Sequence, residues 1–330
     1  MTRLRRSDPN RPGWTRQRSG RGFLFRDEHG VVLQGADRQR CRDLVIPPAW
    51  TQVWICPWPT GHIQVVGVDA DGRRQYLYHP RWRIRRDAQK YERMVVFGHA
   101  LPAARAVVEG HLALPGMPRE RALAAGFRIM DRAGVRVGGE TYARQRGSVG
   151  LATLRREHAS TVGDHVHLRF PGKSGKEHEL DIRDAHLAAT VHALLARRSG
   201  GPELLAFQGP SGWVDLTSSD LNDYVREVMG VDVTAKDFRT WQGALRALSS
   251  LARGGQTSPK RAVSAAMRDV SQHLGNTPAV ARSAYVDPRI VERFEAGATL
   301  PMPEGVEAAG EEDPIDLVEW EAPLLELLEG

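Results

Sequence analysis

The hydrophobic and polar positions of this 330-residue chain change their period at about residue 88. Before that point, "HIQVVGVD" and "RRQYLYH" alternate as strands do and flank Ala70-Asp71-Gly72, which is a hairpin turn signal. The alternation places Tyr76 and Tyr78 on one face of the second strand. The proline-rich stretches "VIPPAW" and "PWP" interrupt any helix in this region. Residues 23–87 are therefore predicted to be a β-rich domain.

After residue 88 the apolar positions take helical spacing, as in "YERMVVFGHALPAARAVVEGHL" and "PRERALAAGFRIMDRAG". One β element interrupts the helices, because "HVHLRFPGKSGKEHELDI" reads as two strands around a tip at 172–175. Thr234 to Asp237 resembles a capping box, and Ser258-Pro259 opens a further helix. The predicted fold class is α+β, with a β-rich N-terminal domain, a mostly helical domain and a small β-hairpin.

Four segments follow from this reading. Residues 1–22 form a basic arm expected to be disordered, and 23–87 form the β-rich domain. Residues 88–298 form the mainly helical domain, and 299–330 form an acidic C-terminal tail. The tail ends in "PLLELLEG", which predicts either a short docking helix or a disordered end.

Charge is unevenly distributed along the chain. Residues 301–330 hold ten acidic side chains and no lysine or arginine, so the preceding 300 residues carry a net charge of +16 against +6 for the whole chain. A body this basic attracts polyanions, which favours nucleic acid as the partner over a merely solvated basic surface. The sequence shows no secretory signal and no apolar run that could cross a bilayer. With Cys41 and Cys56 as its two cysteines, the chain is expected in a reducing cytoplasm, associated with the nucleoid.

The sequence argues against three kinds of site: a nucleotide-binding phosphate loop, a histidine metal site and a paired-magnesium site. "GKS" at Gly172 resembles a phosphate-binding loop, but that motif needs a glycine five positions earlier, where His167 stands, and it must open a helix. His165 and His167 on one strand and His178 on its partner read as a polar sheet face rather than as metal ligands. No carboxylates cluster as paired magnesium ions require. Neither a metal nor a cofactor is expected.

Five side chains form a set with a chemical logic: Arg136, Lys173, Arg239, Asn276 and Tyr285. A tyrosine can attack a phosphodiester without a metal if fixed cations neutralise the transition state. Arginine presents a planar fork of donors to two phosphoryl oxygens. The sugar alkoxide is a poor leaving group, so a lysine that protonates it lowers the barrier.

The blocks "RVGGETYARQRGSVGLATLRREH", "FPGKSGKEH", "TAKDFRTW" and "LGNTPAVARSAYVDP" resemble, in order, the signature blocks of type IB DNA topoisomerases, especially the small poxvirus-like form found in bacteria. The resemblance covers residues 20–298. It implies a β-rich domain and a helical catalytic domain that clamp duplex DNA as a monomer. It also implies relaxation of supercoils through transient cleavage of one strand, rotation and religation, without ATP or metal.

The resemblance also assigns roles to residues. It makes Tyr285 the nucleophile that becomes linked to the 3′-phosphate, Arg136 and Arg239 the phosphate-binding arginines, and Lys173 the general acid. It gives DNA contacts to Gln75, Tyr76 and Tyr78 in the N-terminal domain and to Lys236 near the second arginine.

Asn276 departs from the family, which usually has histidine at this position. An amide donates a hydrogen bond but carries no positive charge and no transferable proton at neutral pH, so its expected role is hydrogen-bond stabilisation. The alternative is that Asn276 merely caps the turn after Gly275.

Two other functions remain open on sequence alone. A tyrosine recombinase or integrase uses a related catalytic set, but it typically carries His-x-x-Arg where this chain has Lys236-Asp237-Phe238-Arg239. A DNA-binding architectural protein with a weak or dead site is the second alternative.

Overall fold

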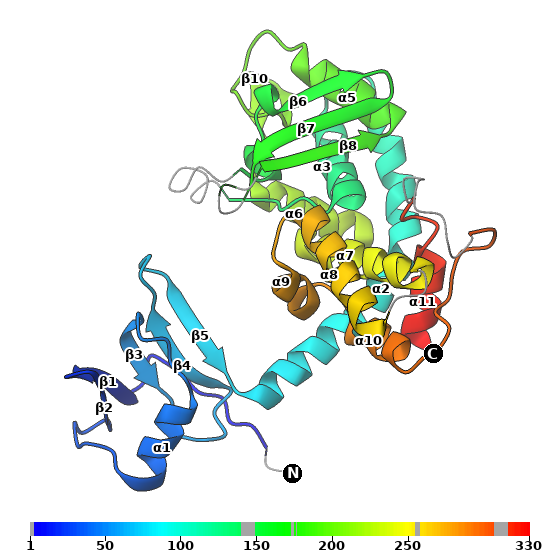
Figure 1. The fold of residues 1–330 in the computed structure, drawn as a ribbon. Helices are drawn as coiled ribbons and strands as arrows, with labels where there is room; N and C mark the ends of the chain where they lie inside the picture. Colours follow the sequence, from blue (N-terminus) through cyan, green and yellow to red (C-terminus); the bar gives the residue numbers. More distant parts are fainter. Residues whose placement is uncertain (1–2, 140–148, 173–174, 176, 255–257, 307–315) are drawn as a thin grey trace. The chain divides into compact units, whose positions relative to one another are not determined.

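The computed structural model describes residues 3–139, 149–172, 175, 177–254, 258–306 and 316–330 (Figure 1). The chain divides into two compact units, Met1–Tyr91 and Glu92–Gly330. The division falls within the long helix α2 (Pro80–Leu112). None of the helices in these ranges combines the length and the apolar character needed to cross a membrane.

The first unit contains a five-stranded antiparallel sheet. The strands lie in the order β2-β1-β3-β4-β5, and their bounds are Trp14–Ser19 (β1), Gly22–Arg26 (β2), Thr51–Ile55 (β3), Ile63–Val68 (β4) and Arg74–Tyr78 (β5). Trp14, Phe25, Ile55 and Val65 form the centre of its small core. The predicted β-rich N-terminal region is confirmed.

Two details of this unit differ from expectation. The sequence predicts a disordered arm that includes residues 14–19, but these residues form β1, which pairs with both β2 and β3. Helix α1 (Gly35–Asp43) interrupts the region predicted as strands. Cys41 is its single buried side chain, so the helix has no apolar stripe that a sequence pattern could reveal.

The hairpin between β4 and β5 is confirmed. Gly72 takes a φ of +76°, and the Asp69 carboxylate accepts hydrogen bonds from the backbone N–H groups of Asp71 and Arg73. The rings of Tyr76 and Tyr78 stack with their centroids 6.0 Å apart and remain about one-third exposed. The predicted common face of the two tyrosines is therefore correct.

The second unit is mainly helical. After the rest of α2, its principal helices are α3 (Arg119–Ala133), α5 (Ala185–Leu195), α6 (Ser218–Met229), α7 (Ala235–Arg253), α8 (Pro259–Leu274), α9 (Pro278–Ala284), α10 (Pro288–Glu295) and α11 (Glu321–Glu329). Phe238 of α7 packs edge-to-face on Phe97 of α2 and on Phe127 of α3, with ring centroids 4.9 and 5.0 Å apart. Such pairs add about 0.5–1.5 kcal/mol each beyond area burial. Helices α3 and α7 thus form the centre of the unit.

The predicted helix signals are confirmed. Thr234 and Asp237 form a capping box at the start of α7, and Pro259 is the first residue of α8. The backbone N–H of Thr234 donates to the Asp237 carboxylate over 2.8 Å. One boundary differs, because α2 begins at Pro80 rather than near residue 88. Its first turns are exposed and basic, so they lack apolar spacing.

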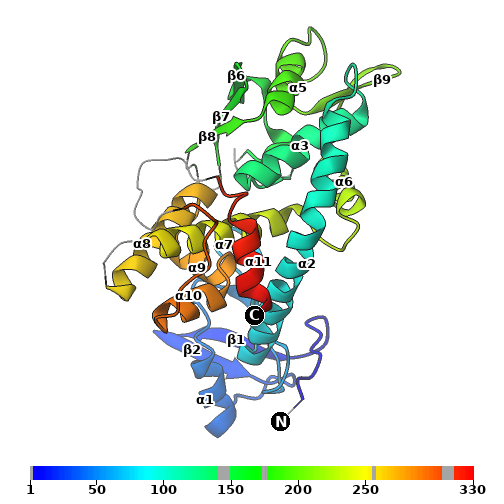
Figure 2. The ribbon, with the colours of Figure 1, turned by 90° about the vertical axis from the view of Figure 1, so that its right-hand side faces the viewer.

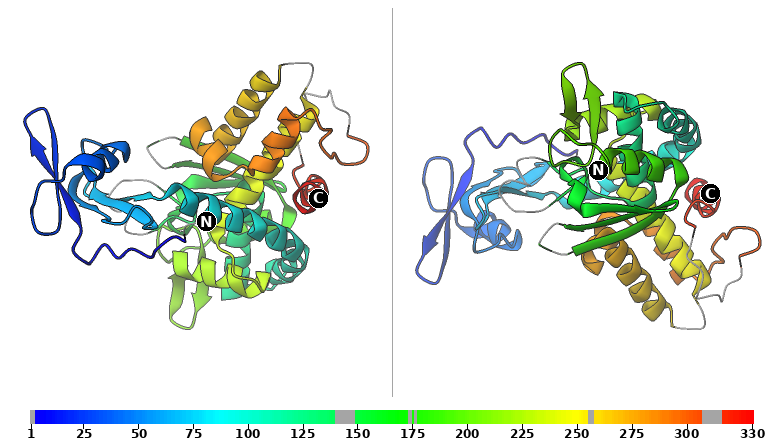
Figure 3. Two further views of the ribbon diagram at one scale, coloured as in Figure 1. Left: turned by 90° about the horizontal axis from the view of Figure 1, so that it is seen from below. Right: turned by 90° about the horizontal axis from the view of Figure 1, so that it is seen from above.

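The β element of this unit is larger than the predicted hairpin. Strands β6 (Ala159–Val162), β7 (His165–Pro171) and β8 (Glu177–Arg183) form a three-stranded antiparallel sheet, whose strands run side by side in the view from above (Figure 3). A separate hairpin joins β9 (Ala206–Gly209) to β10 (Gly212–Asp215).

The histidines of this sheet do not share one face. His165 and His167 stack on the outer face beside Asp181, as predicted. His178 was assigned to the same polar face, which is wrong. It pairs with Phe170 across β7 and β8 and shares the inner face with Leu180 and Ile182.

The end of the acidic tail is the docking helix α11. Its side chains Leu324, Leu327 and Leu328 are buried, and Figure 2 shows the helix beside α7 and α2. Arg105 of α2 donates to both Glu321 of α11 and Asp131 of α3. Glu321 also accepts a hydrogen bond from the indole N–H of Trp241 over 3.1 Å. This network ties α11 to the three central helices.

Truncating a buried leucine of α11 should destabilise the second unit. Leu324 has no exposed surface, so Leu324→Ala should lower the free energy of unfolding by about 2–5 kcal/mol. Glu326→Ala, at an exposed position of the same helix, should change it by about 0.5 kcal/mol or less. Urea unfolding of both variants measures this. An unchanged Leu324→Ala would mean that α11 does not dock in solution.

Candidate active site

Two glycine turns at helix ends frame the site. Helix α3 ends at Gly134 and helix α8 ends at Gly275, with φ values of +57° and +59°. Glycine adopts this left-handed conformation without the steric cost that a side chain would add. Each turn leaves main-chain carbonyl groups at the negative end of a helix dipole, where they attract cations.

Both predicted arginines are held by these carbonyl groups. The guanidinium of Arg239 on α7 donates to the carbonyl oxygen of Gly134 and, over 2.8 Å, to that of Leu274. Arg136, just beyond α3, donates to the carbonyl oxygen of Gly275 over 3.4 Å. Arg239 is 4% exposed, whereas Arg136 is half-buried. The planar fork of Arg239 is thus fixed in orientation by two acceptors.

Tyr285 lies directly after the short helix α9 and is half-buried. Its ring centroid is 5.0 Å from the guanidinium carbon of Arg239. Helix α7 makes room for it at Gly243, where a Cβ atom would lie 2.9 Å from the Cβ of Tyr285. The tyrosine that the sequence singles out therefore lies against the second arginine.

The cations around Tyr285 act on its hydroxyl group. Burial alone would raise the pKa of Tyr285, but Arg239, Arg136 and Lys236 together bring it below its usual value. Lys236 itself is exposed, about one turn before Arg239 on α7. A lowered pKa favours the phenolate, which is the nucleophilic form.

Asn276 does not serve as the helix cap. Thr277 is the N-cap of α9, and its hydroxyl oxygen accepts a hydrogen bond from the backbone N–H of Val280. Both polar atoms of the Asn276 amide are buried, and neither makes a hydrogen bond within the described residues. The interpretation of Asn276 as a cap is therefore wrong, and in the part of the chain that the structure describes its amide keeps buried, unpaired hydrogen-bonding groups beside the turn at Gly275.

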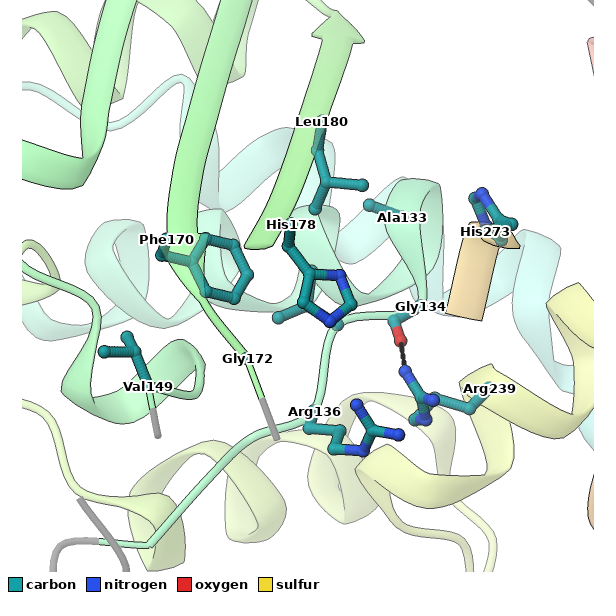
Figure 4. Close-up of a pocket in the computed structure, with 11 residues that line it drawn as sticks. Ala133, Gly134, Arg136, Val149, Phe170, Gly172, His178, Leu180, Arg239 and His273 are labelled. Carbon is teal, nitrogen blue, oxygen red and sulfur yellow. Dashed lines mark hydrogen bonds between the residues drawn. The ribbon is translucent and has the colours of Figure 1, made fainter. Parts of the chain in front are cut away.

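A small pocket opens between the glycine turns and the three-stranded sheet (Figure 4). Arg136, Arg239, His178 and His273 line it, together with Gly172 at the end of β7. Lys173, the predicted general acid, follows Gly172 but lies outside the described residues. The structure thus brings together Arg136, Arg239 and Tyr285 with Lys236 close by. Asn276 directly follows Gly275, and Lys173 stays a prediction.

His273 at the end of α8 is held neutral. Burial, together with the charges of Arg246 and Arg239, lowers its pKa from 6.5 to about 3. Above pH 6.5 the histidine is neutral in both folded and unfolded chains. Between pH 6.5 and 3 the unfolded chain binds a proton that the folded chain does not, so this residue makes stability fall as the pH falls.

His273→Gln should therefore reduce the acid sensitivity of the fold. The free energy of unfolding of wild type relative to the variant should decrease between pH 6.5 and 4, by at most about 1.4 kcal/mol per pH unit for one proton. Urea unfolding at several pH values measures it, with His192→Gln at an exposed position as the control. A difference that stays constant with pH would show that His273 titrates normally in the folded protein.

The DNA contacts predicted in the N-terminal domain fall on two faces of β5. Tyr76 and Tyr78 are exposed together, whereas Gln75 lies on the other face, where it donates to Asp69 over 2.8 Å. These three contacts remain predictions.

Sequence reasoning missed two residues of this site, Gly243 and His178. His178 lies two residues before Leu180 and four before Ile182, so the period of a strand puts all three on one face. This spacing is the signal that could have placed His178 inward. No group of three or more histidine, cysteine, aspartate or glutamate side chains that could hold a metal ion occurs in the described ranges.

Comparison with known families matches most of the chain. Residues 79–297 match the family described as "Eukaryotic DNA topoisomerase I, catalytic core". Residues 22–69 match the family described as "Bacterial DNA topoisomerase IB, N-terminal domain". The first match contains all the residues that converge on the pocket.

Individual relatives agree with these matches. A DNA topoisomerase 1B of Acanthamoeba polyphaga mimivirus is 28% identical over 319 residues, which cover 93% of each chain. The DNA topoisomerase 1B of Vaccinia virus (strain Copenhagen) is 22% identical over 240 residues, covering 69% of this chain and 71% of that protein. A DNA topoisomerase I of monkeypox virus is 22% identical over 234 residues, with the same coverage.

Proposed function

The chain belongs to the DNA topoisomerase I family of isomerases, and we propose from this that it relaxes supercoiled DNA by cutting and resealing one strand. The observation that carries the proposal is the position of Tyr285 against Arg239, beside Arg136, with its pKa lowered by these cations. The reaction needs neither ATP nor a metal ion. It proceeds through a 3′-phosphotyrosyl intermediate, and strand rotation occurs while the bond is open.

In the cleavage step, the Tyr285 hydroxyl oxygen attacks the scissile phosphorus. The new oxygen–phosphorus bond forms as the bond to the 5′-oxygen breaks, and the phenolic proton is released to solvent. Lys173 donates a proton to the departing 5′-oxygen, as the resemblance implies. Religation reverses these steps, with the 5′-hydroxyl displacing the tyrosine.

Fixed cations supply most of the stabilisation. The two guanidinium groups present several N–H donors to the non-bridging oxygens, whose negative charge grows in the pentavalent transition state. The orientation of Arg239 is set before DNA arrives, because two carbonyl oxygens already hold its fork. The buried amide of Asn276 adds a neutral donor.

DNA binding combines the two units. Tyr76 and Tyr78 present a stacked aromatic pair from β5, and Lys236 adds a cation near the site. The high positive charge of the chain before residue 300 makes binding strongly dependent on salt concentration. The protein acts as a monomer clamped around duplex DNA in the cytoplasm, at the nucleoid.

Plasmid relaxation tests the proposal. The protein should relax positively and negatively supercoiled plasmid equally well in EDTA without ATP, and a denaturant quench should trap protein linked to a 3′-phosphate. Loss of activity in EDTA, or a requirement for ATP, would refute the mechanism. A tyrosine recombinase would instead exchange strands between two specific sites, and an architectural protein would bind without forming an adduct.

A further inference from the structure

His178 occupies a position that its sequence context does not suggest. Its ring stacks on Phe170 of the neighbouring strand, with centroids 5.3 Å apart and planes 10° from parallel. The stack holds the imidazole on the inner face of the sheet and away from the exposed pair His165 and His167. Figure 4 shows the ring projecting from β8 toward Gly134 and Arg136.

The imidazole also lies against Gly275. A Cβ atom at Gly275 would be 2.1 Å from Cε1 and 2.3 Å from Nε2 of His178, so glycine is required there by the ring as well as by the positive φ. The carbonyl oxygen of Gly275 accepts the hydrogen bond from Arg136, and the next residue is Asn276. The side chains of His178 and Arg136 therefore meet at Gly275, which directly precedes Asn276.

We propose that His178 is a further active-site residue, whose imidazole N–H donates a hydrogen bond to a non-bridging oxygen of the scissile phosphate. The inference rests on the proposed function, since it requires the phosphate to occupy the pocket of Arg136 and Arg239. In this proposal β8 supplies an imidazole donor to the site, in addition to the amide donor that Asn276 supplies from the turn after α8. His273 also lines the pocket, and burial together with the charges of Arg246 and Arg239 keeps it neutral with a pKa of about 3.

Two substitutions separate hydrogen bonding from packing. His178→Phe keeps a ring that can stack on Phe170 and removes the N–H donor, whereas His178→Gln keeps a donor and loses the ring. Single-turnover cleavage should fall roughly 10²-fold in His178→Phe and less than about 10-fold in His178→Gln. Non-covalent DNA affinity and the melting temperature of His178→Phe should match the wild type. His167→Phe, on the outer face of the same sheet, serves as the control and should cleave normally.

A normal cleavage rate in His178→Phe would overturn the proposal. Equal losses in the Phe and Gln variants with lowered melting temperatures would assign His178 to packing and also overturn it. The proposed function fails separately, if the wild type itself forms no adduct.

Discussion

Tyr285→Phe should abolish the covalent protein–DNA adduct and all relaxation activity. The substitution removes a single oxygen atom, the one that attacks phosphorus, and it keeps the ring that packs near Arg239 and over Gly243. The fold and the non-covalent affinity for duplex DNA should therefore remain unchanged. Adduct formation is measured by denaturing gel with a suicide duplex whose cleaved strand is 5′-labelled, so that the label stays on the fragment linked to Tyr285. Affinity is measured by fluorescence anisotropy.

A second tyrosine provides a matched control. Tyr224 on α6 is buried, its hydroxyl lies 2.8 Å from Nδ1 of His111, and burial raises its pKa. At Tyr285 the cations outweigh burial, whereas at Tyr224 burial and the charges of Glu227 and Glu120 raise the pKa together. Tyr224→Phe should form the adduct normally. An adduct in Tyr285→Phe would place the nucleophile elsewhere in the chain.

Arg239→Lys should slow single-turnover cleavage by about 10²-fold or more, although it preserves the positive charge. The two carbonyl oxygens of Gly134 and Leu274 orient a planar fork, and a lysine ammonium cannot satisfy both and still present paired donors to phosphate. Affinity for DNA should change little, because the charge remains. Quench-flow cleavage of a suicide substrate at saturating protein measures the rate.

Arg246→Lys is the control on the same helix. Arg246 pairs with Asp269 over 2.9 Å, a contact that lysine can also make. Its cleavage rate should stay within about threefold of wild type, since lysine can keep this partly buried ion pair and Arg246 does not line the pocket. If Arg239→Lys cleaves as fast as Arg246→Lys, the bidentate geometry of Arg239 has no catalytic importance.

The sequence predicts those elements whose signals are local. Helix α7 begins at the capping box of Thr234 and Asp237, and the β4–β5 hairpin turns at Gly72, because a few neighbouring residues determine each feature. Helix α1 was not predicted because it buries one side chain and so shows no apolar stripe. Strand β1 was not predicted because its arginine-rich sequence resembles a solvated arm, although its backbone can still pair with a neighbouring strand. Sheet pairing depends on distant partners that composition does not reveal.

The same distinction applies to the active site. Tyr285, Arg136, Arg239 and Asn276 are predicted because their motifs resemble those of a family. The fold brings Tyr285, Arg136 and Arg239 together, beside the turn that precedes Asn276. His178 was placed on the wrong face, because a histidine near other histidines reads as polar surface. Its position depends on the pairing of β8 with β7, where Phe170 lies opposite His178. Such a contact between strands cannot be read from the local sequence.

The way the two arginines are held also affects the stability of the free protein. Within the described residues, Arg136 and Arg239 are bonded to main-chain carbonyl groups and not to carboxylates. Burial and the neighbouring charge of Arg136 lower the pKa of Arg239, which means that the fold holds this cation at a cost. A carboxylate partner would relieve that cost but would repel phosphate. The DNA-free protein should therefore be less stable than its core alone would make it. In the proposed function, the bound phosphate should act as the missing counter-ion and stabilise the second unit, which the melting temperature with and without DNA measures.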